Sequence, residues 1–523
     1  MSSKKPLPLA AIDIGSNAAR MVLAHAEGPE RVKIVKTLRE PLRLGKEVFA
    51  SGTIGERGLA RLLRCLERFR NQMDRSGTRL YRAVATSALR EAEDREEVIQ
   101  TVARQTGLEI QVIGGEEEAR YVYLAIAREV PLNGRLAAMI DIGGGSVEIT
   151  MSRNQEILAV DSLKLGTVRV LKRLQSGTDD PDFRQRLREY ALANRGHLQK
   201  LTRRSAVEVC IGTGGNVEAL GDLRCRLLGR ESNGMLTREE LDTLSKRLES
   251  MSYLERIEKL ELRPDRADVI LPAAIVLQTL MEVLRADHLL IPHVGLKDGV
   301  LRELVEEHFC ENPSLTRQQA IQSALQMGDR HGFDRQHAQQ VTDLALQLFD
   351  ETRFLHQLGE EQRFLLEVAA LLHDVGKAVN VSSHHKHSHY LVRHTPLFGL
   401  TMPQRIQVAC VARYHRKAAP EPAHEELREV PPRDRQPIVI LSALLRLAEA
   451  LDAEHGGQVR RVEASQGKRR VTLYLEGPGG MLLERWAVQK TLAILERALG
   501  CPFRIRVKGP GRKADASAEA AQA

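Results

Sequence analysis

The chain has little of what marks a secreted or membrane protein. Its six cysteines are scattered through 523 residues with no Cys-x-x-Cys pair and no paired spacing, which predicts reduced thiols. No run approaches the roughly 20 apolar residues of a membrane span. The short apolar run near the start is interrupted by prolines and by Asp13, which argues against a signal peptide. We therefore expect a cytoplasmic protein without a membrane segment.

The bulk composition excludes few other classes. A hydrophobic content of 42% is ordinary for a soluble protein. Because single cores stop growing at roughly 250 to 300 residues, a chain of 523 residues predicts three or four compact units. The net charge of +8 suits a polyanionic ligand. It is too mild to distinguish a phosphate-rich substrate from nucleic acid or from a solvated basic surface.

A glycine-rich stretch, 138–150, organises the chain. A short apolar run leads into Asp141, and three glycines, Gly143, Gly144 and Gly145, precede Ser146. Glycine adopts positive φ without steric cost, and its backbone N–H groups can close around an anion. An acidic residue beside such a turn would repel phosphate unless a divalent cation lay between them, so Asp141 and Glu148 predict phosphate together with Mg²⁺. The turn alone is weak evidence, because tight hairpins also use glycine.

The same pattern occurs upstream, which strengthens the interpretation. Residues 12–15 and 140–143 share the string Ile-Asp-Ile-Gly, each preceded by a strand-like run and followed by apolar residues. Such internal similarity predicts two related lobes with phosphate turns that face one another. A third glycine turn, 210–216, follows another β-type run. Three turns in this order are far more specific than any one of them.

These turns resemble those of the actin, sugar kinase and Hsp70 superfamily. Within it, the chain resembles the exopolyphosphatase and guanosine pentaphosphate phosphohydrolase (Ppx/GppA) family over residues 8–308. The resemblance implies an α/β fold with two actin/sugar-kinase-like (ribonuclease H-like) lobes. We expect lobe I at 6–124, lobe II at 125–308, an all-α HD-like domain at 314–455, a small α+β unit at 456–510 and a disordered tail at 511–523, with a linker near 311–314.

The resemblance also implies catalytic residues. Glu118, in Glu-Glu-Ala-Arg, matches the glutamate that acts as general base on the attacking water, and Arg90 matches an arginine near the phosphate. From the residues alone, three glutamates in a first helical turn need no chemistry because they favour the helix dipole, and Arg90 could be a surface arginine. We expect Glu118 to lie in an exposed first helical turn.

The remaining implied site residues bind metal and phosphate. Asp13, Asp141 and Glu148 are expected to hold Mg²⁺, directly or through water. A third turn faces a nucleotide in the kinase relatives, and Arg266 lies in a segment whose arginine approaches the site, although a solvated loop is nearly as plausible for it. The expected phosphate-binding residues are Gly15, Ser16, Asn17, Arg20, Gly143, Gly144, Gly145, Ser146, Gly212, Thr213, Gly214 and Arg266.

Beyond residue 314 the periodicity becomes helical, and seven of the 17 histidines fall between 373 and 415. His373-Asp374 ends an apolar helix and resembles the signature of HD-type phosphohydrolases. The resemblance implies a second divalent metal held by His337, His373, Asp374 and Asp452, with His389 or His415 completing a further site. Imidazole and carboxylate together suit Mn, Fe, Zn or Mg. The alternative is a scaffold that lengthens a polyphosphate groove.

The leading functional hypothesis is a Mg²⁺-dependent exopolyphosphatase that releases terminal orthophosphate from inorganic polyphosphate. Its nearest alternative is a pppGpp 5′-phosphohydrolase of the same family, since both reactions need the same phosphate machinery. A sugar-kinase-like phosphotransferase and a nucleotide-sensing HD-domain regulator are the other classes. We expect a homodimer that binds inorganic polyphosphate or pppGpp and has no nucleic-acid partner.

Overall fold

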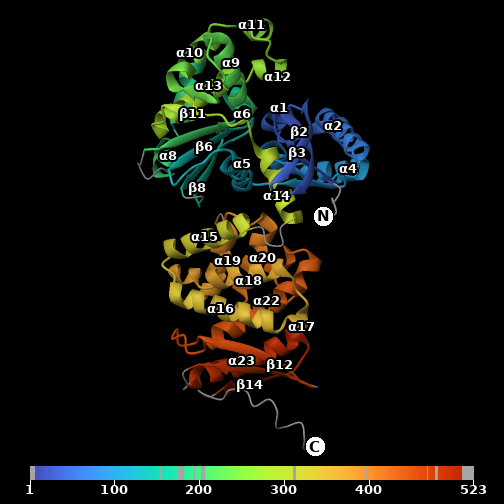
Figure 1. Cartoon of the computed structure of the whole chain (residues 1–523), viewed down its shortest axis with the longest axis vertical. Helices are drawn as coiled ribbons and strands as arrows, with labels where there is room; N and C mark the ends of the chain where they lie inside the picture. Colours follow the sequence, from blue (N-terminus) through green and yellow to red (C-terminus); the bar gives the residue numbers. More distant parts are fainter. Residues whose placement is uncertain are drawn as a thin grey trace, which may run out of the picture. The chain divides into compact units, whose positions relative to one another are not determined.

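The computed structural model describes most of the chain in two compact units, divided between residues 313 and 314 (Figure 1). Residues 311–313 of the predicted linker, Cys310 and the predicted tail 511–523 lie outside the described residues, whereas Ser314 of that linker begins a helix. The described residues are 6–153, 156–174, 182–193, 195–201, 206–309, 314–395, 397–467, 469–477 and 481–508.

The first lobe is built on a five-stranded sheet with the order β3-β2-β1-β4-β5. Strands β1, β2 and β3 are antiparallel neighbours, and β4 and β5 run parallel to β1. Its strands are β1 (Leu7–Ile14), β2 (Ala18–Gly28), β3 (Arg31–Pro41), β4 (Leu80–Ala85) and β5 (Ile110–Val112). Its helices are α1 (Leu44–Ser51), α2 (Gly55–Arg75), α3 (Ser87–Glu91), α4 (Arg95–Thr106) and α5 (Gly115–Glu129).

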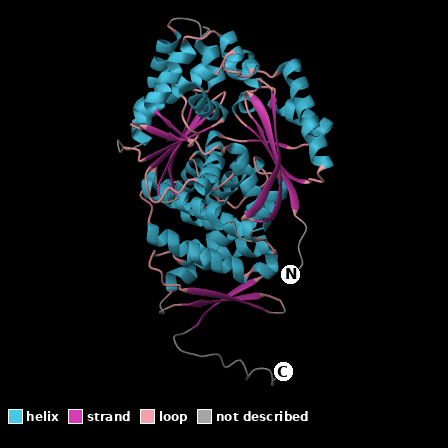
Figure 2. Ribbon diagram, turned by 45° about the horizontal axis from the view of Figure 1, so that its top comes forward, coloured by secondary structure: helices cyan, strands magenta, loops and turns pink. Residues whose placement is uncertain are grey.

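The second lobe repeats this arrangement, which confirms the prediction of two related lobes (Figure 2). In the order β10-β11-β9-β6-β7-β8, β6 is antiparallel to β7 and parallel to β9, as β1 is to β2 and β4. Its strands are β6 (Ala137–Ile142), β7 (Val147–Arg153), β8 (Glu156–Leu163), β9 (Val209–Thr213), β10 (Met235–Thr237) and β11 (His288–Leu290). Its helices are α6 (Thr167–Leu174), α7 (Phe183–Leu192), α8 (Arg195–Leu201), α9 (Gly215–Leu228), α10 (Arg238–Glu249), α11 (Tyr253–Glu258), α12 (Pro264–Ala267), α13 (Ile270–Leu284) and α14 (Leu296–Phe309).

Strand alternation directs the two repeated aspartates away from the lobe cores. In β1, Ile12 and Ile14 belong to the core of the first lobe, so Asp13 between them points to the opposite face. In β6, Ile140 and Ile142 belong to the core of the second lobe, so Asp141 between them points to the opposite face. Because β1 and β6 are covered on both faces, their sequences read as almost uninterrupted apolar runs.

Helix α14 joins the end of the second lobe back to the first. It packs on β1, β2 and α5, and α5 in turn packs against β7 and β8 of the second sheet. The helices cross so closely that a Cβ on Gly299 would lie 1.8 Å from the backbone oxygen of Tyr121. Glycine at this position therefore allows the contact through which α5 and α14 connect the two sheets.

One stretch of the second lobe, Pro264–Leu284, is long and apolar enough by composition to cross a membrane. It comprises α12 and the apolar helix α13, and 78% of its most apolar window is buried inside the fold. Nearly all of α13 belongs to the second-lobe core. A core helix of a globular domain has these properties.

The second unit is mostly helical, as predicted, and ends in a three-stranded sheet in the order β12-β13-β14. Its helices are α15 (Ser314–Arg330), α16 (Arg335–Glu351), α17 (Arg353–His356), α18 (Glu360–Leu372), η1 (Val375–Ala378), α19 (His384–His394), α20 (Met402–Arg413), α21 (Glu425–Arg428), α22 (Pro432–Leu451) and α23 (Leu482–Leu499). Its strands are β12 (Arg461–Gln466), β13 (Val471–Glu476) and β14 (Phe503–Lys508).

The predicted boundary between 455 and 456 does not divide the hydrophobic core of this unit. Leu344 and Leu348 of α16 share one cluster with Val462 of β12 and Leu473 of β13. Helix α23, which connects β13 to the parallel strand β14, packs on α22. Short strands of this length rarely stand alone, and here their apolar face is buried against helices.

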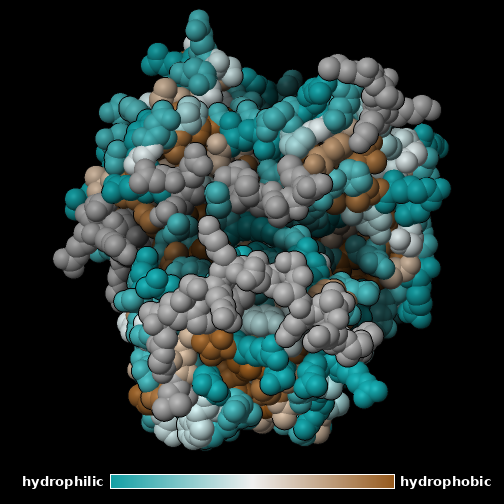
Figure 3. Space-filling model, turned by 60° about the horizontal axis from the view of Figure 1, so that its bottom comes forward, coloured by the Kyte–Doolittle hydropathy of each residue, from teal (hydrophilic) through white to brown (hydrophobic). Residues whose placement is uncertain are grey.

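On the face drawn in Figure 3, hydrophilic residues predominate and hydrophobic ones form smaller patches between them. The large exposed hydrophobic side chains come from many separate elements: Ile34, Val35, Leu158, Leu254, Phe354, Val379, Val381, Tyr390, Met402, Leu483, Trp486 and Val507.

Candidate active site

The two glycine turns meet in the first unit. The β1–β2 turn and the β6–β7 turn are so close that a Cβ on Gly144 would lie 3.1 Å from Ser16 Cβ and 3.5 Å from Asn17 N. Residues of both turns line one cavity of about 100 Å³, together with Asp13, Glu118 and Asp141. The sequence repeat therefore places two phosphate-type turns next to each other on the wall of one cavity.

The first backbone amide of each turn makes a hydrogen bond within the turn. Gly15 N–H donates to the Ala18 oxygen (3.1 Å) and Gly143 N–H donates to the Ser146 oxygen (3.0 Å). These two amides close the turns and are not directed at a ligand, which corrects the expectation that both bind phosphate through N–H. The amides later in each turn, from Ser16 and Asn17 and from Gly144 and Ser146, are the better candidates.

Three residues expected to bind phosphate, Gly145, Gly212 and Thr213, are not among the described residues that line the cavity. A Cβ on Gly145 would lie 2.2 Å from Ser87 Oγ, so this glycine serves packing. Gly212 lies inside β9 against Leu289. Thr213 Oγ1 donates to Asp141 Oδ1 (2.9 Å), so its hydroxyl orients a carboxylate.

The third turn instead contributes Gly214 and the residues after it. Gly214, the N-cap residue just before α9, has φ of 92°, and a Cβ on it would lie 2.9 Å from Asp141 Oδ1. A Cβ on Gly215 would meet the guanidinium groups of Arg20 and Arg266, at 2.7 and 2.8 Å. The N-terminus of α9 therefore faces the cavity among basic side chains, an arrangement that favours anions.

Three carboxylates converge beside the turns. One oxygen each of Glu118, Asp141 and Glu148 lies within 4.8 Å of the others. The register that pairs Asp141 with Glu148 in β6 and β7 brings two of them together, and α5 supplies the third. Buried oxygens Glu118 Oε2 and Glu148 Oε2 have no hydrogen-bond partner.

Burial raises the pKa of each of these groups, and neighbouring negative charges reinforce the rise. Burial raises the pKa of Asp141 to about 6. Burial, reinforced by the charge of Asp141, raises the pKa of Glu148 to about 7. Burial and the nearby Glu148 hold the pKa of Glu118 well above its ordinary value. Burial therefore shifts each of these carboxyls towards its protonated form, and a bound cation would shift it back towards the ionised form.

Glu118 is buried, which corrects the expectation of an exposed first helical turn. Its exposed fraction is only 6%, because α5 lies between the two sheets. The predicted partner Arg90 lies behind it: Nη1 is 3.6 Å from Glu118 Oε2 and donates to the Ile113 oxygen (2.7 Å). Arg90 is not among the described residues on the cavity wall, so it acts on Glu118 rather than directly on a phosphate.

Asp13 stands apart from the three clustered carboxylates. Its Oδ2 is 3.3 Å from Arg20 Nη1, and the register of β1 and β2 sets the two residues opposite each other. Burial raises the pKa of Asp13, and the Arg20 charge opposes the rise. The predicted ligand Asp13 thus lies on the cavity wall with a guanidinium as its closest partner.

Four basic groups line the cavity: Arg20, Arg39, Arg266 and Lys297. Burial, with the nearby Arg39 and Arg20 charges, lowers the pKa of Arg266 to about 10. Its Nε is buried without a hydrogen-bond partner, so this side chain is poised for an anion. Arg39 also pairs with Asp265 next to Arg266, which links β3 of the first lobe to α12 of the second.

Sequence reasoning missed Arg39 and Lys297. Arg39 lies directly opposite Arg20 in the β2–β3 register, on the same face of the sheet. Arg39 could be recognised only once β2 and β3 were paired, because residues opposite each other on neighbouring strands point to the same face of the sheet. Lys297 lies in the first turn of α14, two residues after Gly295.

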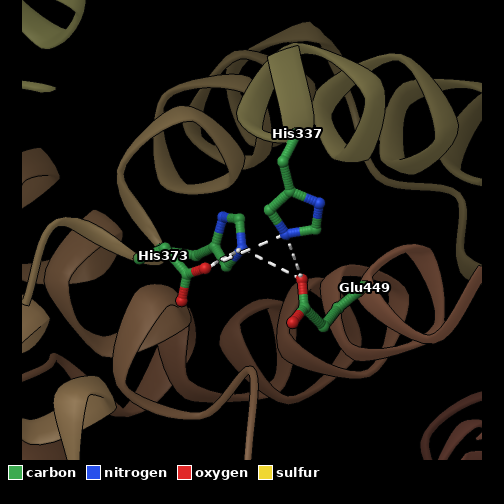
Figure 4. Close-up of side chains that lie close together, drawn as sticks. His337, His373 and Glu449 are labelled. Atoms are coloured by element: carbon green, nitrogen blue, oxygen red, sulfur yellow. Dashed lines mark hydrogen bonds and ion pairs between the residues drawn. The ribbon is translucent and has the colours of Figure 1, made fainter. Parts of the chain in front are cut away.

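In the second unit the structure brings together His337, His373 and Asp374 as predicted partners, and adds Glu449 (Figure 4). His373 and Asp374 follow α18, His337 lies on α16 and Glu449 on α22. The predicted ligand Asp452 is not in this group. Its Oδ2 accepts a hydrogen bond from His337 Nδ1 (2.7 Å), on the side of the ring that faces away from the group.

A second group joins Asp374 to His384 and His415. Of the two alternatives for a further ligand, His415 is therefore in the cluster, and His389 belongs to neither of the two groups found among the described residues. Glu449 and His384 were missed, because an isolated glutamate on an apolar helix and one of several adjacent histidines give no distinguishing pattern.

The chain matches two family models. Residues 21–308 match the Ppx/GppA phosphatase family, and residues 317–493 match Ppx/GppA phosphatase, domain III. The first match spans more than half of the chain, and together they cover both compact units.

Similar proteins include enzymes named guanosine-5′-triphosphate,3′-diphosphate pyrophosphatase. That of Vibrio vulnificus is 29% identical over 426 residues, 80% of this chain and 82% of the relative. That of Aliivibrio fischeri strain MJ11 is 29% identical over 427 residues, with the same coverage.

Among solved structures, an exopolyphosphatase from Cytophaga hutchinsonii superposes with a TM-score of 0.55 at 22% identity. It covers 57% of this chain and 98% of its own, which supports the fold. The Aquifex aeolicus member of the Ppx/GppA family superposes with a TM-score of 0.50 at 25% identity, covering 58% of this chain and 98% of its own. With two actin-like lobes followed by a helical domain III, the chain belongs to the Ppx/GppA phosphatase family.

Proposed function

We propose that this phosphatase hydrolyses the terminal phosphoanhydride bond of the 5′-triphosphate in guanosine 5′-triphosphate 3′-diphosphate (pppGpp), releasing orthophosphate. The curated relatives named for this substrate align over 80% of the chain, across both units. They support pppGpp better than the leading hypothesis from the sequence, inorganic polyphosphate. The observation that carries the chemistry is the buried Glu118 carboxylate beside two facing glycine turns.

The terminal phosphate would bind between the two turns. Backbone N–H groups of Ser16 and Asn17 from one turn and of Gly144 and Ser146 from the other are the expected donors. Arg20, Arg39 and Arg266 offset the negative charge of the preceding phosphates. The cationic wall fixes the phosphate chain so that water can approach the terminal phosphorus in line with the bond to be broken.

Glu118 would accept the proton of that water. The water oxygen forms a bond to the terminal phosphorus, the bridging P–O bond breaks, and the leaving oxygen departs on the shortened nucleotide. Arg90, 3.6 Å from Glu118 Oε2, favours the carboxylate form that can accept the proton. Burial and the nearby Glu148 raise the pKa of Glu118 well above its ordinary value, which makes the carboxylate a stronger base.

The clustered carboxylates fit Mg²⁺. Asp141 and Glu148 offer oxygen ligands beside the base Glu118, Glu148 Oε2 has no hydrogen-bond partner, and the neighbouring negative charges need a cation for stability. When bound, Mg²⁺ would neutralise phosphate charge and polarise the phosphoryl group. Thr213 and Ser162 keep Asp141 and Glu148 oriented through hydrogen bonds of 2.9 Å each.

A hollow next to the phosphate turn supports a nucleotide substrate. It has a volume of about 180 Å³ and shares Asn17 with the phosphate cavity. Its wall combines apolar side chains with basic ones, an arrangement suited to a base with nearby phosphates. The lining residues are Asn17, Arg43, Lys46, Val168, Leu171, Lys172, Asp268 and Val269.

Inorganic polyphosphate is the second candidate, favoured by the four cations on the cavity wall, which need no base or ribose. The test is kcat/KM for phosphate release from pppGpp and from long polyphosphate with one preparation. We expect pppGpp to be preferred. A higher kcat/KM on polyphosphate would reverse the assignment.

Leu171→Ala sharpens this comparison. Loss of an apolar contact to the base should raise KM for pppGpp roughly tenfold and leave polyphosphate turnover within twofold. Arg173→Ala, an exposed neighbour on the same helix outside the hollow, is the matched control. Equal effects of Leu171→Ala on both substrates would show that the hollow does not bind the nucleotide.

A further inference from the structure

Helix α6 holds the carbonyl groups of the second phosphate turn, residues 143–146. The backbone amides at the start of α6 donate to oxygens of the turn, as follows: Thr167 to Gly143 (3.1 Å), Val168 to Gly144 (2.8 Å) and Arg169 to Gly144 (3.1 Å). The next carbonyl, that of Gly145, accepts from the side chain of Arg169 instead, through Nε at 2.5 Å. A guanidinium therefore continues the row of donors that the N-terminus of the helix begins.

These bonds decide where the amides of the turn point. In a trans peptide the carbonyl and the following N–H point in opposite directions. The Gly143 carbonyl is held by α6, so the Gly144 N–H points away from that helix. The Gly145 carbonyl is held by Arg169, so the Ser146 N–H points away from the guanidinium. Gly144 and Ser146 both line the cavity, and neither amide has an acceptor among the described residues, which leaves both for a bound anion.

The far end of the Arg169 side chain contacts the first lobe. Its Nη2 lies 2.5 Å from Glu91 Oε1 at the end of α3, and its guanidinium carbon lies 4.0 Å from the centre of the Phe49 ring on α1. The side chain is only 13% exposed. Phe49 also packs on the turn itself, because a Cβ on Gly145 would lie 2.6 Å from Phe49 Cζ. Arg169 thus bridges a turn of the second lobe and two helices of the first.

The contacts of Arg169 favour a geometric role over a direct charge contact with substrate. Arg169 is not among the described residues that line the cavity, and Glu91 offsets its charge. A planar guanidinium donates in two fixed directions, here from Nε to the turn and from Nη2 to Glu91, while its face lies on an aromatic ring. A lysine ammonium at this position would keep the charge but not this geometry.

We propose that Arg169 is a positioning residue for phosphate hydrolysis, which fixes the peptide before Ser146 so that the Ser146 N–H donates to the bound phosphate. The inference rests on the proposed function, in which a phosphate binds between the two turns. Helix α3 carries Glu91 next to Arg90, whose guanidinium lies 3.6 Å from Glu118. The alignment of the phosphate turn and that of the general base therefore depend on the same short helix of the first lobe.

The test compares full-length variants in saturating Mg²⁺. Removing one donor to a transition-state oxyanion costs roughly 10² to 10³ in rate, and a misdirected donor should cost less. We expect Arg169→Met to lower kcat/KM for phosphate release roughly thirtyfold and to raise Ki for orthovanadate, a mimic of the phosphoryl group in transfer, by a similar factor. Kd for orthophosphate should rise less, about fivefold. The pH dependence of kcat/KM should keep the wild-type shape, because Glu118 is untouched.

Rescue separates positioning from a general structural role. Methylguanidinium should restore much of the activity of Arg169→Ala, because it can reoccupy the bridge, whereas methylammonium at the same concentration should not. Arg169→Lys keeps the charge and most of the length, and should resemble Arg169→Met in kcat/KM and in Ki for orthovanadate. It also carries the test if Arg169→Met does not fold. Circular dichroism establishes that each variant is folded.

Two further variants complete the design. Arg173→Met removes an exposed cation one turn later on α6 and should keep the wild-type kinetic constants. Glu91→Gln should lower kcat/KM about threefold, and adding it to Arg169→Met should cause little further loss, because both side chains act through one bridge.

Unchanged Ki for orthovanadate in folded Arg169→Met, or wild-type kinetics in Arg169→Lys, would overturn the proposal. A wild type that does not hydrolyse pppGpp would refute the proposed substrate instead. The orthovanadate and orthophosphate constants would still decide the role of Arg169, because they do not depend on which phosphate ester or anhydride is cleaved.

Discussion

Replacing Glu148 with glutamine should stabilise the metal-free protein at alkaline pH. Burial and the charge of Asp141 raise the pKa of Glu148 from 4.5 to about 7. A carboxyl whose pKa is raised by folding binds its proton more tightly in the folded state. Folding stability is therefore lost as pH rises from about 4.5 through about 7. Glutamine carries no charge, and its side-chain oxygen can still accept the Ser162 hydroxyl.

The magnitude follows from the size of the shift. Each pKa unit corresponds to 1.36 kcal/mol, so ionised Glu148 lowers the free energy of unfolding by about 3 kcal/mol at pH 8. About 3 kcal/mol corresponds to roughly 6 to 12 °C in melting temperature for a domain of 150 to 250 residues, and to less for the larger unit Met1–Pro313 that contains Glu148. Near pH 4.5 the carboxyl is protonated in the folded state, and the difference should almost vanish.

Differential scanning fluorimetry in EDTA between pH 5 and pH 8 measures this effect. Glu129→Gln, which removes one exposed carboxylate from the same helix as Glu118, controls for net charge. Added Mg²⁺ should reverse the order, because the wild type gains a ligand that the variant lacks. A wild type that is more stable than Glu148→Gln at pH 8 in EDTA would refute the reasoning.

Three further predictions concern other parts of the first unit. Gly299→Ala should destabilise the protein by about 3 kcal/mol in a urea titration, because its Cβ would lie 1.8 Å from the Tyr121 oxygen; wild-type stability would disprove the close crossing of α5 and α14. Arg266→Met should raise KM for the phosphate substrate roughly tenfold, through loss of a charge-assisted hydrogen bond, whereas the exposed Arg263→Met should not; equal KM values would remove Arg266 from the site. Phosphate release should stop in EDTA and return with Mg²⁺, and full activity in EDTA would exclude the metal from the reaction.

The repeated Ile-Asp-Ile-Gly strings were enough to predict two related lobes and their facing turns, because strand, turn and strand are local patterns. Strand alternation also fixes that Asp13 and Asp141 point away from the lobe cores. The sequence could not show that Glu118 is buried, since its exposure depends on α5 packing between sheets that are distant in the chain.

Long-range packing explains the other differences as well. Arg39 reaches the cavity through the β2–β3 register, and Glu449 reaches the histidines because α22 crosses α16. Asp452 matched a ligand pattern, yet its place at the end of α22 sets it against the outer nitrogen of His337. The end unit looked separate because its strands are short, but its apolar face completes the core of the helices.

The most direct test of the central claim is the rate of phosphate release by Glu118→Gln, measured on pppGpp with saturating Mg²⁺. Loss of a general base typically reduces kcat by on the order of 10² to 10⁴. We expect this loss of kcat in a Glu118→Gln protein whose far-ultraviolet circular dichroism spectrum matches that of the wild type. Glu116→Gln, the same change two residues away and off the cavity wall, should keep near-normal activity. Near-wild-type kcat in a folded Glu118→Gln protein would contradict the assignment of water activation to Glu118.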